Sequence, residues 1–324
     1  MSEVAALEPF GGFHSAFYFR ELYLRDEVRY EKFYCPFCGV LLDPVLVYAP
    51  SDQELGKSPH FRTQRGGANH HDGCDGNPCN YQNPTRANPV QEHIQRLPFS
   101  LPTEFAAYVE PQSGSQSGSA CRAPVPSLTP ADIRRRREEA GRRYGVARFR
   151  VSLVQSLAEV HNAILKDAYR RKEENNWSKE EFNNWIKNVL QAPINLRGFS
   201  TTYRIALHDL WFAVPSCPRV FHGSQARVEQ VEGGYQITSK RPGKVGKGNT
   251  VLPFVITVSL RDADGVELRG ARRALLRQLE RAVKEDATVR WYAYGRANMT
   301  DERFELAFDR ANISDLFVKL QKKG

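Results

Sequence analysis

Two short stretches of the chain combine cysteine and histidine at metal-ligand spacing. Cys35 and Cys38 have two residues between them and are followed by Gly39, while His70 and Cys74 have three residues between them. Two thiolates in one tight turn can converge on one ion, and glycine accepts the positive φ that the turn requires. An imidazole and a thiolate from a second turn would complete a tetrahedron. The pattern therefore predicts a structural Zn²⁺ site with the ligands Cys35, Cys38, His70 and Cys74, which leave no open position for water.

The ligand set and the use of the cysteines have alternatives. His71, His60 or Cys79 could replace one of the predicted ligands. A redox role for the Cys-Pro-Phe-Cys turn would require the first cysteine to open a helix that lowers its pKa. The apolar residues after Gly39 instead indicate a turn that enters a strand, so metal binding is favoured over redox chemistry and over unpaired structural cysteines.

The order of these motifs resembles a known module. A Tyr-Cys-Pro-x-Cys-Gly turn at 34–39, a His-Phe pair at 60–61 and a His and Cys at 70–74 are similar to the N-terminal zinc finger of CoiA-like competence proteins and of uncharacterised proteins of bacterial mobile elements. The resemblance covers about residues 34–79. In that family a nuclease domain follows, with an Asp and then Glu-x-Lys on adjacent strands. The nearest match here lies at 262–269, where Arg269 stands in place of the lysine.

Composition limits the class of protein and of partner. The 324 residues are 41% hydrophobic and carry a formal net charge of +9, with a pI near 9.3. A chain of this length can form two or three domains, and its basic balance favours a polyanionic partner. We expect no secretory signal at the N-terminus and no membrane segment, because no apolar run approaches about 20 residues. Cysteines at metal-ligand spacing without a signal favour the reducing cytoplasm.

A run of small polar residues divides the chain. Residues 111–119 consist almost entirely of Ser, Gly and Gln, which cannot offset the entropy of being ordered. We therefore predict a zinc-binding module at 1–110, a flexible linker at 111–129, a helical segment at 130–195 and a C-terminal domain at 196–324.

Hydrophobic periodicity gives the expected elements of the first two parts. Alternating apolar residues at 17–24 and 28–34 predict a hairpin that leads into the first cysteine turn, and a short helix is expected at 90–97. A helix should begin after Thr129, and another should run from 153 to about 171. Ser178 and Glu181 form a capping box for a third helix that ends before Pro193.

The C-terminal part alternates between strand and helix patterns. Strands are expected at 204–214, 252–260, and in two hairpins, 226–231 with 235–238 and 289–295 with 303–308; a helix is expected at 270–285. Counted from residue 226, three strands, one helix and two strands follow the order of an OB-fold. The predicted fold class is therefore a multidomain α+β protein with a zinc-stapled β module, a helical middle and an OB-like barrel.

Basic and aromatic residues give a candidate nucleic-acid surface. An OB-like barrel binds single strands with cations on the phosphates and aromatic rings on the bases. Trp291 and its neighbour should face opposite sides of one strand, so only one of the two can serve in stacking. The candidate nucleic-acid residues are Arg134, Arg135, Arg136, Lys240, Arg241, Lys244, Lys247, Trp291 and Tyr292.

These patterns together favour one function over two others. The expected function is a zinc-containing protein that binds DNA or RNA, single-stranded in preference, as an accessory factor of a bacterial mobile element or phage-defence system. A metal-dependent nuclease related to CoiA-like proteins is one alternative. An adaptor that binds other proteins of the same system is the other.

Overall fold

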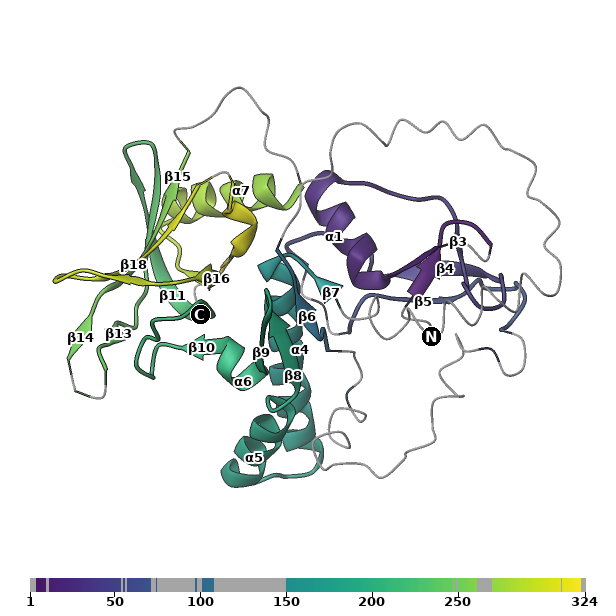
Figure 1. The fold of residues 1–324 in the computed structure, drawn as a ribbon, viewed down its shortest axis with the longest axis horizontal. Helices are drawn as coiled ribbons and strands as arrows, with labels where there is room; N and C mark the ends of the chain where they lie inside the picture. Colours follow the sequence, from purple (N-terminus) through teal and green to yellow (C-terminus); the bar gives the residue numbers. More distant parts are fainter. Residues whose placement is uncertain are drawn as a thin grey trace.

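The fold was analysed in a computed structural model of the chain, which describes residues 4–9, 12–53, 55, 57–70, 74, 97, 101–107, 150–246, 248, 250–260, 270–309 and 311–321 (Figure 1). Three hydrophobic cores lie in this part of the chain. One belongs to the N-terminal module, one to the central unit and one to the C-terminal sheet.

The N-terminal module is a small antiparallel sheet with one helix. Its strands lie in the order β2-β1-β3-β4-β5, and the helix α1 follows β2 directly. The bounds are β1 (Val4–Ala6), β2 (Phe13–Ser15), α1 (Ala16–Asp26), β3 (Phe33–Tyr34), β4 (Leu41–Val45) and β5 (His60–Thr63). Phe19, Phe33 and Phe61 pack edge to face or tilted in the core, so the aromatic residues of this stretch stabilise the module itself.

The expected hairpin at 17–34 is wrong, because its first half is the helix α1. Ser15 begins this helix, since its hydroxyl accepts a hydrogen bond from the Tyr18 amide at 3.1 Å. Phe19 and Leu22 pack into the module, whereas Phe17 packs into the central core. A helix that is buried on two sides lacks a simple polar face, and its apolar residues then mimic the alternation of a strand.

The central unit combines a short sheet with two helices. Its strands β6 (Glu104–Phe105), β7 (Arg150–Val151), β8 (Pro193–Leu196) and β9 (Phe199–Thr202) lie in the order β7-β6-β8-β9. The predicted helices are confirmed as α4 (Val154–Glu174) and α5 (Lys179–Val189), and the Ser178 capping box is present. Phe105, from within the stretch assigned to the zinc module, lies in this central core.

The C-terminal unit is a mixed, twisted sheet in the order β17-β18-β15-β12-β11-β16-β19. The helix α7 (Gly270–Lys284), which the sequence predicted, packs against β11 and β19. Helix α4 packs against β16 and β19, and Figure 1 shows the two helices on opposite sides of the sheet. The strand bounds are β11 (Arg219–Val231), β12 (Gly234–Thr238), β15 (Phe254–Ser259), β16 (Val289–Gly295), β17 (Asn298–Met299), β18 (Phe304–Phe308) and β19 (Leu316–Leu320).

This sheet is open, so the expected OB-like barrel is wrong. The hairpin β11–β12 and the strand β15 form as expected, with antiparallel pairing throughout. However, β18 pairs in parallel with β15, and none of the described sheets closes on itself. The order of strands and helices along the chain can be predicted from the sequence, but whether the sheet closes into a barrel depends on which edge strands pair. The same order of elements fits an open sheet and a closed barrel.

Two further expectations in this unit are wrong. The strands β16 and β18 do not form a hairpin, because β16 lies between β11 and β19 while β18 lies between β15 and β17. The apolar run at 204–214 is not one strand either. It contains the end of α6 (Tyr203–Ala206), then β10 (Leu207–Asp209), which pairs in parallel with β11, and then an exposed turn.

Helix α1 attaches the N-terminal module to α4. The Arg20 guanidinium is fully buried, donates to both carboxylate oxygens of Glu159 at 2.6 and 2.9 Å, and also reaches the carbonyls of Leu46 and Ala49. Glu21 lies beside it at the first turn of α4. The module is therefore held by buried, charge-assisted hydrogen bonds as well as by apolar contact.

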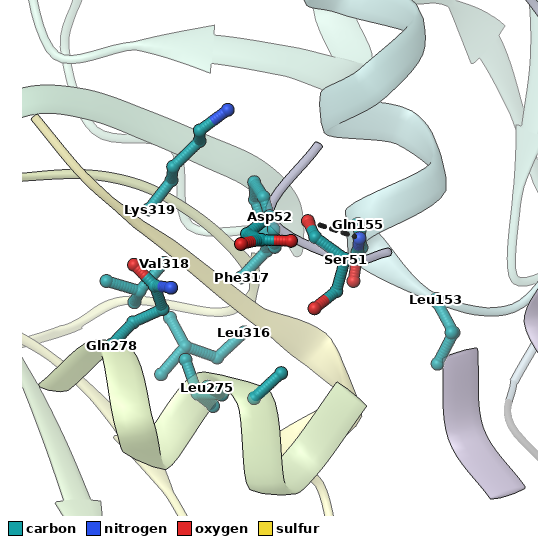
Figure 2. Close-up of a pocket in the computed structure, with 11 residues that line it drawn as sticks. Ser51, Asp52, Leu153, Gln155, Leu275, Gln278, Leu316, Phe317, Val318 and Lys319 are labelled. Atoms are coloured by element: carbon teal, nitrogen blue, oxygen red, sulfur yellow. Dashed lines mark hydrogen bonds between the residues drawn. The ribbon is translucent and has the colours of Figure 1, made fainter. Parts of the chain in front are cut away.

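A small cavity marks the same junction. Figure 2 shows Ser51 and Asp52 of the module facing the start of α4, the helix α7 and the strand β19, with the Gln155 amide donating to the Ser51 carbonyl at 3.2 Å. The cavity measures about 30 Å³, which holds a water molecule but no substrate. The cavity is therefore a gap between the two units and not a binding site.

Some predictions fall outside the described residues. These are the linker, the short helix apart from Leu97, the helix after Thr129, the nearest match to the nuclease motif at 262–269, and the candidate residues Arg134, Arg135, Arg136, Lys247, His71 and Cys79. In the part of the chain that is described, no helix has the length and apolar character needed to cross a bilayer.

Candidate metal centre and basic cleft

The first half of the metal centre is a tight turn between β3 and β4. The Gly39 amide donates to the Cys35 carbonyl, and the Cys35 amide donates to the Val40 carbonyl, both at 2.8 Å. Gly39 has φ = 75°, the left-handed conformation that closes this turn without strain only for glycine. The turn directs the Cys35 and Cys38 side chains into the module, where both are buried.

The second half follows β5, which pairs with β4 and so returns the chain to the first turn. The Sγ atoms of Cys35 and Cys74 lie 3.7 Å apart, and the His70 Nδ1 atom lies 3.4 Å from the Cys38 Sγ and 3.6 Å from the Cys74 Sγ. All four ligand atoms lie within 4.8 Å of one another. The predicted set Cys35, Cys38, His70 and Cys74 is thus brought together.

These distances fit a tetrahedral metal ion. With metal bonds of about 2.3 Å to sulfur and about 2.05 Å to nitrogen, the edges of a tetrahedron are about 3.8 Å between sulfurs and about 3.5 Å between sulfur and nitrogen. A disulfide would need about 2.05 Å between the sulfurs, far less than the separation seen here. The cluster can therefore hold one four-coordinate ion, with His70 binding through Nδ1.

His60, the alternative ligand, lies outside the cluster. Its Nδ1 atom is 2.9 Å from the Ser58 carbonyl, and its side chain belongs to the strand β5. In the described part of the molecule it is therefore bound to backbone and not to the metal site.

Three of the four ligands influence one another's protonation when no ion holds them. Hydrogen bonds with Cys35 and Cys74 lower the pKa of Cys38, whereas hydrogen bonds with Cys38 and Cys74, together with burial, raise the pKa of Cys35. Hydrogen bonds with Cys38 and Cys74 raise the pKa of His70 to about 9. Metal binding must therefore displace protons from His70 and from the Cys35 thiol.

A second site is a cleft of about 850 Å³ between α4, β10, β11 and β16. Among the described residues, four cationic side chains line it, Lys240, Arg241, Lys244 and Arg290, against the single carboxylate of Asp209. Three of the four belong to the loop or strand that follows β12, as the sequence predicted for a basic surface. The predicted residues Lys240, Arg241 and Lys244 thus lie together, and Arg290 joins them from β16.

The two predicted aromatic residues lie on opposite faces of the sheet. Trp291 is fully buried in the C-terminal core and stacks on Phe254 at 5.6 Å, so its ring lies where no base can reach it. Tyr292 points to the other face and lines the inner wall of the cleft, but its ring is only 2% exposed and packs against His222, so the expectation that one of the two rings stacks on a base is wrong. Its hydroxyl lies 3.0 Å from the His161 Nδ1 atom.

An exposed aromatic pair at the cleft was missed by the sequence reasoning. Trp211 and Phe212 are 67% and 65% exposed, and the Arg241 guanidinium lies 3.9 Å from the centre of the Trp211 ring. The Asp209 carboxylate positions both partners, since it accepts hydrogen bonds at 2.9 Å from the Trp211 amide and from Arg241. Asp followed by Leu-Trp-Phe was a signal for a turn with exposed rings, but the apolar run around it concealed the turn.

Two histidines lie at the inner side of the cleft. Burial lowers the pKa of His222 to about 4, with His208, Arg290 and Arg241 adding to the shift. Burial also lowers the pKa of His161 well below its usual value. His161 is buried and hydrogen-bonded, and it also lines the cleft.

Comparisons with protein-family models, with curated proteins and with solved structures returned no match. The resemblance of residues 34–79 to the CoiA-like module therefore stays a prediction, although the metal cluster that it implies is present.

Proposed function

We propose that this protein binds single-stranded nucleic acid in the basic cleft and that a structural Zn²⁺ ion holds its N-terminal module together. The observation that carries the proposal is the position of Trp211, a highly exposed indole at the edge of a cleft lined by four cations. Cations bind phosphates and an exposed ring stacks on a base, and both contacts tolerate any sequence. Base stacking also requires unpaired bases, which favours a single strand over a duplex.

The zinc part of the proposal rests on the donor set. Three thiolates and one imidazole at tetrahedral spacing suit Zn²⁺ better than Mg²⁺ or Ca²⁺, which prefer oxygen ligands. Four protein ligands leave no position for substrate, so the ion stabilises the module and takes no part in chemistry. Elemental analysis of the purified protein should give one zinc per chain.

The binding test is a titration with fluorescent single-stranded DNA and RNA over a range of salt concentrations. If all four cations contact phosphates, the slope of log affinity against log salt is about −3, at about 0.7 per contact. Lys244→Glu should weaken binding and reduce the slope, whereas Lys187→Glu, an exposed lysine on α5, should change neither. A slope near zero for the parent protein would contradict nucleic-acid binding.

Stacking is tested with a matched pair of aromatic variants. Trp211→Ala should lower affinity about 5- to 150-fold, because stacking is worth about 1–3 kcal/mol per base. Phe199 offers the control, since it is also exposed, at 53%, and also carries an arginine over its ring, Arg219 at 5.2 Å. Phe199→Ala should leave affinity unchanged. An equal loss of affinity in both variants would contradict the proposal that the strand stacks on Trp211 at the cleft.

The wider setting of the proposal is a cytoplasmic accessory factor of a bacterial mobile element or phage-defence system. This part is supported by the resemblance of residues 34–79 alone. Cleavage of plasmid DNA that requires a divalent ion would instead favour the related nucleases. Binding that ignores salt, with a partner protein of the same system, would favour an adaptor.

A further inference from the structure

Two of the four cations in the basic cleft are held by neutral side chains. The Gln225 Oε1 atom accepts a hydrogen bond from the Lys240 ammonium. The Asn162 Oδ1 atom accepts one from the Arg290 guanidinium at 3.0 Å. An amide oxygen fixes the direction of a cation and leaves its charge uncancelled.

A carboxylate would direct a cation equally well but would cancel its charge. Arg241 shows this case in the same cleft, because its guanidinium pairs with the Asp209 carboxylate at 2.9 Å. Within the described residues, neither Lys240 nor Arg290 pairs with a carboxylate. These two cations therefore combine a full charge with a fixed direction, the two properties that a phosphate site needs.

A β-bulge brings the two cations to the same level of the sheet. The pairing of β11 with β16 has one extra residue on β11, so that Ser224 and Gln225 both lie opposite Arg290. The register of β11 with β12, continued by two residues, places Gln225 opposite Lys240. Gln225 thus lies between Arg290 on one side and Lys240 on the other.

The bulge also lies on an uncovered edge of β11. The strand β12 pairs with residues 227–231, and β10 pairs with residues 220–222 on the same edge, since β16 occupies the other one. Among the described strands, none covers the stretch between these two partners. Ser224 and Gln225 are exposed there and line the cleft. A phosphate can therefore reach the two cations at the bulge.

The backbone at Gln225 gives a separate reason to assign a role to its side chain. Its φ angle is 55°, in the left-handed region that favours glycine. The Gln225 amide donates to the Gln321 Oε1 atom, a bond that a glycine would keep. The fold would therefore be served by glycine at lower cost, and the contact that requires the glutamine side chain is the one with Lys240.

We propose that Lys240 and Arg290 form a subsite for one backbone phosphate of the bound strand, and that Gln225 and Asn162 are the residues that position them. This rests on the proposed function, because the strand must first bind in the cleft. The ligand is a phosphodiester group. Lys240 meets it as a point charge, and Arg290 donates to its oxygens from a planar guanidinium.

The positioning role is tested with the zinc-loaded full chain and a fluorescent oligothymidylate. Gln225→Gly should lower affinity about 2- to 12-fold, because ordering a long side chain on binding costs about 0.5–1.5 kcal/mol. The urea midpoint should stay constant or rise, since glycine relieves the left-handed backbone. Lys240→Met should cost more affinity in the parent than in the Gln225→Gly background, by the same factor. Equal losses in the two backgrounds would overturn the positioning role.

Exchange of amide for carboxylate tests whether the uncancelled charge matters. Gln225→Glu and Asn162→Asp keep the shape and the acceptor oxygen but pair with the cation. Each should therefore reduce the salt slope by about 0.7, the share of one phosphate contact. Gln230→Glu is the control, because it adds the same charge at an exposed position of β11 outside the lining of the cleft, and it should keep the parent slope.

The outcomes separate this subsite from the binding function. A lower urea midpoint in Gln225→Gly would mean that the side chain serves the fold, and would overturn its assignment to the subsite. Parent slopes in both carboxylate variants would also overturn the subsite and leave the binding function standing. Failure of the parent to bind the strand at low salt would overturn the binding function itself.

Discussion

Glu21 gives a direct test of how the N-terminal module is held on the rest of the chain. Its carboxylate is buried at the first turn of α4 and accepts hydrogen bonds from the Ser152 and Leu153 amides at 2.7 and 2.9 Å, and from the Ser152 and Ser156 hydroxyls at 2.6 and 3.0 Å. The residue that begins α4, Leu153, has no capping side chain of its own. Glu21 therefore caps a helix that belongs to another unit.

Two substitutions of Glu21 should differ strongly. Three of the four hydrogen bonds are accepted by Oε1, and the carbonyl oxygen of a glutamine could accept the same three. The fourth is donated by the Ser152 hydroxyl to Oε2, and there the glutamine NH₂ group could donate to the hydroxyl oxygen instead. Glu21→Gln should thus change the free energy of unfolding by less than about 1 kcal/mol. Glu21→Ala leaves two buried amides without a partner, at about 1–3 kcal/mol each, and should cost about 3–5 kcal/mol.

The charge of Glu21 sets the expected pH dependence. Burial raises its pKa, although the hydrogen bonds oppose the shift. The folded state therefore favours the protonated form, and this stabilisation is complete below the unfolded pKa of about 4.3 and is lost as the pH rises through the folded value. The stability of the parent relative to Glu21→Gln should accordingly fall as the pH is raised from 4 to 7.

The assay is urea unfolding followed by tryptophan fluorescence, since Trp177 and Trp185 lie on the central unit that α4 helps to form. Glu31→Ala, an exposed carboxylate of the same module, is the control and should shift stability by no more than about 0.5 kcal/mol. If Glu21→Gln destabilises as much as Glu21→Ala, the charge and not the set of acceptors holds the helix, and the reasoning is refuted.

Three other predictions concern the metal centre and the same junction. Cys74→Ser should lose the bound zinc while His60→Ala keeps it, as measured by elemental analysis; equal loss would move His60 into the ligand set. Zinc affinity should fall as the pH is lowered, because the pKa of about 9 for His70 means that a proton must leave when the ion binds. Calorimetry in two buffers with different ionisation heats should detect that proton as a difference between the two binding enthalpies. Identical binding enthalpies in the two buffers would contradict the release of a proton. Arg20→Met should destabilise by about 3–5 kcal/mol because it removes the ion-pair partner of Glu159, whose side chain is only 11% exposed. The double variant Arg20→Met with Glu159→Met should recover most of that loss, and simple additivity in the double-mutant cycle would show that the pair is not coupled.

The junction also bears on an expectation from the sequence. Because a linker separates the zinc module from the rest, Cys38→Ser should unfold residues 30–80 and leave the C-terminal domain folded. The contacts of α1 with α4 and α7 lie across that boundary. The loss of zinc should therefore also destabilise the first turn of α4. Simultaneous unfolding of all units would refute their independence.

Local patterns in the sequence were sufficient for several parts of this molecule. The ligands Cys35, Cys38, His70 and Cys74 were predictable because tetrahedral coordination requires a short spacing within each half-site, and spacing is visible in a sequence. The helices α4, α5 and α7 were predictable because each buries one face, and the Ser178 capping box marks where α5 begins. The alternation of Trp291 and Tyr292 followed from the period of a strand.

Other parts depended on which surfaces meet. The sequence of helix α1 resembled that of a strand because the helix is buried by two units at once. A local sequence pattern does not show that a second unit packs on the same helix. The open sheet could not be told from a barrel, because strand pairing is decided by contacts between residues far apart in the chain. The cleft brings His161, Trp211, His222, Lys240 and Arg290 together from five separate segments. The sequence alone thus determined the metal ligands and the main helices, whereas only the tertiary structure decided the sheet and the site, since both are made of long-range contacts.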